Sequence, residues 1–337
     1  MKWRIVAFAA SLIPFLVIAI SFHVTPEDIF AVGIVNFLAA FAAMMGKLFL
    51  QGIKFHYIVK TFHGKIESLW RTMFVRIGSE FVTMTTPMFV GGEVVRIYWM
   101  NKRGIATSKA SWLGIFEIVT EVLAAGVLAI TAGVVAIVGG HTIIGVIVLG
   151  TTIPVVGLWA GLFFLTAKRD FQVPKMFVNL VLRFRKEKGQ QYLDKTNQWM
   201  AEICTMTRQN IKAPHAKRAF AVSFLISLLS WMVFGVSFMF ISFGTEKTVT
   251  AIDSILAVMA GNAIGNMPIT VGGSGLAEFG TWAYLSHLDQ FKLELPSDSV
   301  EWDAIIAWRI ATYQLPIPIA WFLLMKMALR KYQKPVE

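Results

Sequence analysis

Long apolar stretches separated by short polar gaps dominate the sequence. Six of them are each long enough to cross a bilayer core of ~30 Å as a helix; they cover residues 5–22, 29–50, 111–138, 142–167, 220–243 and 304–328. Two further apolar segments, residues 70–100 and 251–288, are interrupted by Gly, Pro and charged residues, which predicts broken or re-entrant helices. The pattern therefore predicts an all-α integral membrane protein with about six full transmembrane helices and two broken segments, in one membrane domain over residues 1–337.

The positive charges are distributed unevenly around these stretches. Of the 31 Lys and Arg residues, 28 fall into four groups, which lie at residues 2–4, 47–109, 168–218 and 326–334. An excess of Lys and Arg marks cytoplasmic loops, so we expect a multi-pass protein of the cytoplasmic membrane with both termini in the cytoplasm. The first broken segment must then enter and leave from the cytoplasm and the second from outside, so the two are oppositely oriented.

The composition supports a membrane protein and excludes two other classes. Hydrophobic residues make up 56% of the chain, charged residues 15%, and the mean hydropathy is +0.64, which is outside the range of ordinary soluble domains. The net charge of +11 is accounted for by the cytoplasmic groups, so nucleic acid is not expected as a partner. The single Cys204 excludes an internal disulfide.

One extended polar region, residues 168–218, separates the fourth and fifth stretches. Apolar residues recur at helical spacing from Val173 to Phe184 and cations lie between them, which predicts a cytosolic interfacial amphipathic segment. The alternative is a docking surface for a partner enzyme.

Charged residues occur inside the first broken segment, on either side of its Gly and Pro residues. The candidate site residues here are Arg76, Glu80, Pro87, Gly91, Gly92, Glu93 and Arg96. Arg76 and Glu80 are four apart and Glu93 and Arg96 three apart, so each pair shares a helix face. Charges at membrane depth indicate function by default. Either these pairs only neutralise one another, or the break exposes helix termini and backbone amides to a lipid headgroup.

The second broken segment combines polar residues with a glycine cluster. Its candidate site residues are Asn262, Asn266, Pro268, Gly272, Gly273, Gly275 and Glu278. Glycines let the backbone turn sharply and approach a ligand. Intramembrane candidates on the full spans are Glu117 and Glu121 on the third and Arg309 and Tyr313 on the last. We expect the unpaired Arg309 to meet the two carboxylates, either as a structural ion cluster or as a headgroup and proton site.

At these residues the chain resembles the flippase-like membrane domain of lysylphosphatidylglycerol synthases, the multiple peptide resistance factors. A Pro followed by Gly-Glu, two residues and Arg is similar to Pro87 through Arg96, and a Pro followed by Gly-Gly-x-Gly and Glu is similar to Pro268 through Glu278. A late Arg, Tyr and Pro resemble Arg309, Tyr313 and Pro316. The resemblance covers nearly the whole chain and implies movement of a lipid with a polar or charged headgroup between leaflets.

The chain also departs from the family pattern. An Arg that commonly follows the first Glu of the third span is replaced by Ile118, and Val271 stands where a second Pro is common. The synthases carry a soluble aminoacyl-transferase domain after the membrane part. We therefore expect a stand-alone membrane domain here, without lysyl transfer.

Three functions are compatible with these observations. The favoured one is a lipid flippase or translocase without an ATP-binding motif, which is not an enzyme; the alternatives are a membrane-embedded transferase component acting on a lipid-linked sugar and a non-transporting scaffold. No catalytic residue, metal or cofactor is predicted, because no paired metal ligands or nucleotide motif occur. The expected partners are a membrane lipid with a polar headgroup, a separate lipid-modifying enzyme, and further copies of the chain in a homo-oligomer.

Overall fold

The computed structural model describes seven parts of the chain, which are residues 25–64, 67–86, 91–184, 186–245, 247–267, 269–286 and 302–329. Within them the regular elements are helices, as expected for an all-α membrane protein. The predicted first span, residues 5–22, lies outside the described residues.

Five helical units in the described part are long and apolar enough to cross a membrane, and each corresponds to a predicted span. They are α3 (Ile34–Phe62), α6 (Thr107–Val138), α7 (Thr142–Lys168), α10 with α11 (Pro214–Gly235 and Ser237–Ser242), and the last unit of α14 (Trp302–Arg309), η1 (Ile310–Gln314) and α15 (Pro316–Leu329). The short helix α2 (Pro26–Ala31) precedes α3. The second stretch does not end at residue 50 as predicted, because α3 continues for three more turns to Phe62.

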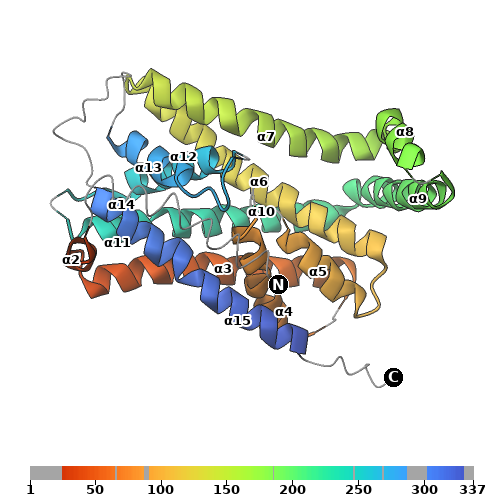
Figure 1. Cartoon of the computed structure of the whole chain (residues 1–337), viewed down its shortest axis with the longest axis horizontal. Coiled ribbons are helices and arrows are strands. Elements are labelled where there is room, and N and C mark those ends of the chain that lie inside the picture. The colour runs from red at the N-terminus through yellow and green to blue at the C-terminus, as the bar shows by residue number, and fades with distance from the viewer. Residues whose placement is uncertain are drawn as a thin grey trace.

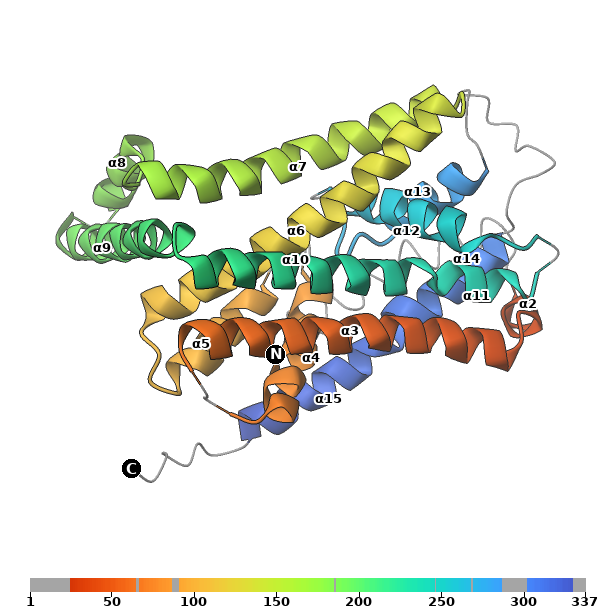
Figure 2. The same ribbon diagram turned by 180° about the vertical axis from the view of Figure 1, so that it is seen from behind.

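Both broken segments form helix pairs separated by an irregular turn. The first consists of α4 (Leu69–Met84) and α5 (Gly92–Asn101), and the second of α12 (Ala251–Gly265) and α13 (Leu276–Leu285). The pair α4 and α5 lies toward the end of the bundle that carries α8 and α9, whereas α12 and α13 lie toward the opposite end (Figures 1 and 2). The two helix pairs therefore lie toward different ends of the bundle; that the first enters from the cytoplasm and the second from outside stays a prediction.

Small residues allow the helices of the second pair to pack closely. A Cβ atom at Gly261 would lie 2.6 Å from the carbonyl oxygen of Ala277, and one at Gly280 would lie 2.9 Å from the Cα atom of Gly261. Close backbone approach at small residues is typical of helix association in membranes. It brings α12 and α13 together without a space between them.

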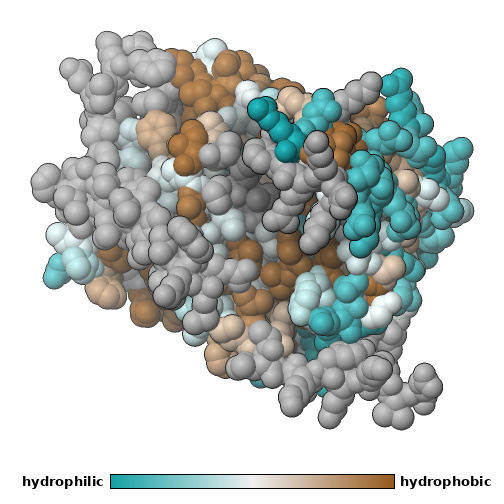
Figure 3. Space-filling view, turned by 45° about the vertical axis from the view of Figure 1, so that its right-hand side comes forward, coloured by the Kyte–Doolittle hydropathy of each residue, from teal (hydrophilic) through white to brown (hydrophobic). Residues whose placement is uncertain are grey.

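The polar region 168–218 is helical, as its periodicity predicted. It forms α8 (Lys175–Phe184) and α9 (Lys186–Ile211), which cross the end of the bundle beside α7 (Figure 1). Hydrophilic side chains gather at this end, while hydrophobic ones cover much of the adjoining surface (Figure 3). The placement of α8 at a membrane surface stays a prediction.

Candidate functional site

The two helix breaks contact each other at the centre of the bundle. The backbone N–H of Gly272 donates a hydrogen bond to the carbonyl oxygen of Thr86 (3.4 Å), and the hydroxyl of Tyr313 donates one to the carbonyl oxygen of Met84 (2.6 Å). Carbonyl groups at the end of a helix have no partner within that helix. Tyr313 and Gly272 supply such partners at the end of α4, so each break helps to satisfy the other.

The glycine turn of the second break is held in a conformation that favours glycine. Gly272, Gly273 and Gly275 have φ angles of 58°, 63° and 86°, which L-residues with a side chain rarely adopt. The turn ends where the backbone N–H of Gly275 donates a hydrogen bond to a Glu278 carboxylate oxygen (2.8 Å) at the start of α13. Glu278 therefore closes the N-terminus of α13 from within its own first turn.

Arg309 joins the last span to this turn. Its Nε donates to a Glu278 carboxylate oxygen (2.9 Å), its Nη2 donates to the carbonyl oxygen of Gly272 (2.6 Å), and its guanidinium carbon lies 4.0 Å from the centre of the Tyr313 ring. The side chains of Arg309, Glu278 and Tyr313 are all buried. The wide turn η1, with its bond from the Leu315 N–H to the Ile310 carbonyl oxygen (3.0 Å), carries Tyr313 to the tip of α4.

A second set of buried charges lies between α4, α5 and α6. The carboxylate of Glu117 pairs with both arginines of the first broken segment: Arg76 Nε lies 2.9 Å from Oε1, and Arg96 Nε lies 3.0 Å from Oε2. Arg76 also contacts Glu80, and Arg96 Nη2 lies 3.1 Å from a Glu93 carboxylate oxygen. Glu117 is fully buried, so it links the two halves of the broken helix inside the bundle.

The network extends to α3 through Glu121. Lys54 Nζ donates to one carboxylate oxygen of Glu121 (2.9 Å) and Gln51 Nε2 donates to the other (2.7 Å), while Gln51 Oε1 accepts from Arg76 Nη2 (2.8 Å). Two turns before Lys54 on α3, Lys47 Nζ lies 3.6 Å from the centre of the Trp231 ring, a cation–π contact. We name the set Lys54, Arg76, Glu80, Glu93, Arg96, Glu117 and Glu121 the charge network.

Only acidic members of the charge network reach accessible space to a sizeable extent. The side chains of Glu93 and Glu121 are 22% and 20% exposed, whereas those of Arg76 and Arg96 are 4% and 2% exposed. The arginines are thus enclosed by their carboxylate partners. Glu93 and Glu121 are therefore the members of the network whose side chains are most accessible to a polar ligand.

A separate clamp closes the open ends of the α4 and α5 pair. Glu67, just before α4, accepts hydrogen bonds from Arg71 (2.8 Å) and from Arg103, just after α5 (3.1 Å). Partial burial by itself raises the pKa of Glu67, but the two arginines outweigh it, so its pKa lies below the usual value of 4.5. Glu67 therefore stays ionised at neutral pH and holds the two helix ends together.

The predicted site residues fall into two groups rather than one. The local pairs Arg76 with Glu80 and Glu93 with Arg96 are both present. The prediction that Arg309 meets Glu117 and Glu121 is wrong. Arg309 forms an ion pair with Glu278, and the carboxylates of Glu117 and Glu121 pair with cations of α3, α4 and α5. Each buried charge pairs with the nearest buried opposite charge, because a buried charge without a partner is energetically costly.

Other predicted residues have more limited roles in the structure. Gly92 lets α5 approach α4, since a Cβ there would lie 2.9 Å from the Ser79 carbonyl oxygen, and Gly91 precedes it with a φ of 116°. The side chains of Asn262 and Asn266 are half-buried and make no hydrogen bond in the part of the chain that the structure describes. Pro87 and Pro268 lie outside the described residues.

The contribution of α3 to the site was not predicted from the sequence. Lys47 and Lys54 were counted with the cytoplasmic basic residues, yet they are only 8% and 0% exposed, and Arg76 and Arg96 from the same group are also buried. Four of the ten basic residues from 47 to 109 are therefore inside the bundle, which weakens the charge bias on which the orientation was based. Gln51 was not predicted as a site residue either. The signal in the sequence was a polar residue within an apolar stretch, three residues before Lys54.

The chain matches the profile of a known protein family. The profile of the family described as "Lysylphosphatidylglycerol synthase TM region" matches residues 4–319. A comparison with curated proteins gave no significant match.

Proposed function

The chain belongs to the lysylphosphatidylglycerol synthase transmembrane-region family, and from this membership and the site described above we propose that it moves a lipid between the two leaflets of a membrane. The lipid carries a polar or charged headgroup. The protein is a transporter in this proposal and not an enzyme, and its membrane is the cytoplasmic membrane.

The contact between the two helix breaks is the observation that carries the proposal. A continuous helix satisfies its own backbone and offers nothing to a headgroup, whereas a break leaves helix termini in the middle of the membrane. Transporters with discontinuous helices bind their substrates at such termini near the midplane. Here the breaks meet between Thr86 and Gly272, beside two sets of buried charges.

The accessibility of the charge network supports a headgroup with a positively charged group. Glu93 and Glu121 are the members that a ligand meets, and a carboxylate attracts an ammonium group strongly where water is scarce. Glu121 is already paired with Lys54, so a headgroup amine competes with that lysine. In this scheme the lysine and the headgroup exchange at one carboxylate while the acyl chains stay in lipid.

Two kinds of partner follow from the proposal. The first is the transported lipid. The second is a separate lipid-modifying enzyme that supplies the charged headgroup, since a family resemblance to a synthase region implies such chemistry nearby. Self-association into a homo-oligomer is a further expectation.

Reconstitution into vesicles tests the proposal. Vesicles contain a trace of phospholipid with a fluorescent acyl chain and either an aminoacylated or an uncharged headgroup, and extraction by albumin reports how much reaches the outer leaflet. We expect wild-type protein to speed the amine-bearing lipid more than the uncharged one.

The matched variants are Glu93→Gln in the network and Asp170→Asn, whose carboxylate is 60% exposed at the end of α7. We expect Glu93→Gln to slow transfer about tenfold, as for loss of a charge-assisted contact, and Asp170→Asn to leave it unchanged. Equal rates with and without protein for both lipids, with folded protein in the vesicles, would show that the chain is not a lipid transporter and favour the scaffold alternative.

A further inference from the structure

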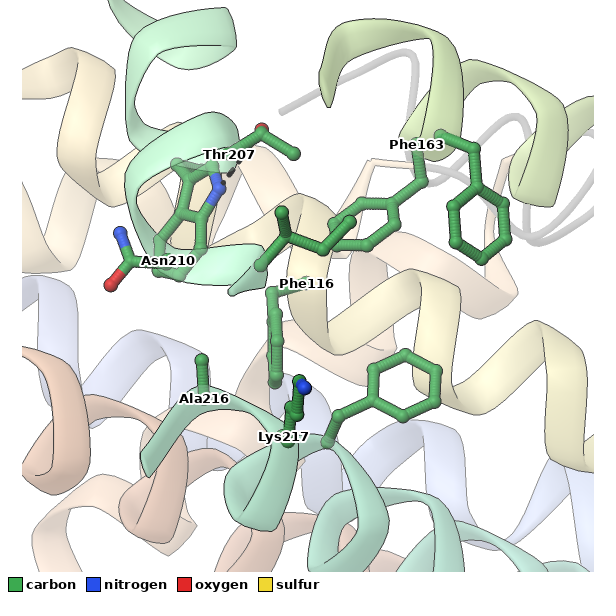
Figure 4. Close-up of a pocket in the computed structure, with 10 residues that line it drawn as sticks. Phe116, Phe163, Thr207, Asn210, Ala216 and Lys217 are labelled. Atoms are coloured by element: carbon green, nitrogen blue, oxygen red, sulfur yellow. Dashed lines mark hydrogen bonds between the residues drawn. The ribbon is translucent and has the colours of Figure 1, made fainter. Parts of the chain in front are cut away.

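A cavity of about 230 Å³ lies where α6, α7, α9 and α10 meet (Figure 4). Its walls carry five aromatic rings from three of these helices: Trp112, Phe116, Phe163, Phe164 and Phe220. The cavity is separate from the charge network, because Phe116 faces it while the next residue, Glu117, binds Arg76 and Arg96. The inference below therefore does not rest on the transport proposal.

The aromatic wall is held in place by its own contacts. Phe116 packs edge to face against Phe220 and Phe163, with ring centres 5.9 Å and 6.4 Å apart. The indole N–H of Trp112 donates to the hydroxyl of Thr207 (3.2 Å), and the amide of Asn210 donates to the carbonyl oxygen of Met206 (2.8 Å). These polar groups are used within the wall, so the cavity offers a preformed apolar surface.

The mouth of the cavity combines an apolar and a cationic residue. Phe164 on the spanning helix α7 is 56% exposed, Lys217 in the first turn of α10 is also exposed, and both residues line the cavity. Phe116 from α6 and Lys217 from α10 border the same space (Figure 4). The opening thus faces both the apolar surface of a spanning helix and the polar end of the bundle.

We infer that this cavity binds one acyl chain of an anionic phospholipid whose phosphate group lies at Lys217. A peptide does not fit the interior, because its backbone polar groups need partners that an aromatic wall lacks. A hydrocarbon chain needs none, and it reaches the cavity from the membrane past Phe164. The cation at the mouth selects a negative headgroup in the leaflet at the end that carries α8 and α9.

Native mass spectrometry of the full-length protein in detergent tests this site. The protein is titrated with phosphatidylglycerol or with phosphatidylcholine of the same acyl chains, and bound lipids are counted. We expect wild-type protein to retain phosphatidylglycerol more strongly than phosphatidylcholine. Lys217→Gln should weaken its binding about fivefold, from the usual contribution of one cation at a membrane surface, and Lys217→Arg should preserve it.

Two variants distinguish the site from general attraction. Arg218→Gln removes the same charge from the next, exposed position, which is not part of the lining, and should change retention much less than Lys217→Gln. Ala216→Leu places a larger side chain into the space and should reduce the number of retained lipids by one. If Lys217→Gln and Arg218→Gln weaken binding equally, or if Lys217→Gln and Ala216→Leu both retain phosphatidylglycerol like wild type, the cavity is not an anionic lipid site.

Discussion

Replacing Gly272 by Ala disrupts the contact between the helix breaks with the addition of one methyl group. Gly272 is buried and has a φ of 58°. A Cβ there would overlap the hydroxyl of Tyr313 and lie 2.6 Å from the carbonyl oxygen of Met84, which are the two partners of the hydrogen bond that joins the last span to α4. The methyl group and this hydrogen bond cannot occupy the same place.

The expected loss of stability has two parts. A left-handed conformation costs about 1–2 kcal/mol for a residue with a side chain. Losing the buried Tyr313 hydrogen bond and leaving the Met84 carbonyl without that partner adds about 1–3 kcal/mol. We therefore expect Gly272→Ala to lower the free energy of unfolding by about 2–5 kcal/mol.

Gly104→Ala provides the matched control. Gly104 also has a positive φ, of 85°, but a Cβ there would meet nothing within 4 Å. It should cost only the conformational part, about 1–2 kcal/mol. Thermal unfolding of both purified variants in the same detergent measures the difference. Equal loss of stability in the two variants would refute the reasoning that Gly272 holds the breaks together.

Two further predictions concern the charges around α4 and α5. The double variant Glu93→Arg and Arg96→Glu, which exchanges the two charges, should be less stable than wild type in thermal unfolding, because the new carboxylate at position 96 would face Glu117. If the double variant is as stable as wild type, only the local pair matters. Glu67→Gln should lower stability by about 0.5–1 kcal/mol at pH 7. Because the folded pKa of Glu67 is depressed, its contribution is fully present above pH 4.5 and is lost as the pH falls below 4.5 and through the lower folded pKa. In urea unfolding, the difference between wild type and Glu67→Gln should therefore shrink as the pH is lowered below 4.5; a constant difference at all pH values would contradict the clamp with Arg103.

Local sequence signals predicted the elements well. The breaks after Met84 and before Leu276 follow from clusters that combine glycines with a proline within a few residues of each other. The ends of α6 and α7 at residues 138 and 142 follow equally from a Gly-Gly-His turn. Such features depend on neighbours in the sequence, so a single sequence is enough to find them.

The partners of the buried charges could not be predicted in the same way. Glu121 is 67 residues from Lys54, and Glu278 is 31 residues from Arg309. No periodicity connects residues at such distances, and the bundle geometry alone decides which charges meet. Lys54 shows the consequence: by sequence it looks like a lysine at the end of a span, whereas in the structure it is fully buried against a carboxylate.

The rate of lipid movement in vesicles tests the central claim most directly. Vesicles that contain only lipid and purified protein, without nucleotide, are loaded with an amine-bearing fluorescent phospholipid in the inner leaflet, and its arrival in the outer leaflet is followed. We predict faster arrival with wild type and with Gly104→Ala than in protein-free vesicles, and a loss of this effect with folded Gly272→Ala. Transfer by Gly272→Ala at the wild-type rate would contradict movement along the joined helix breaks.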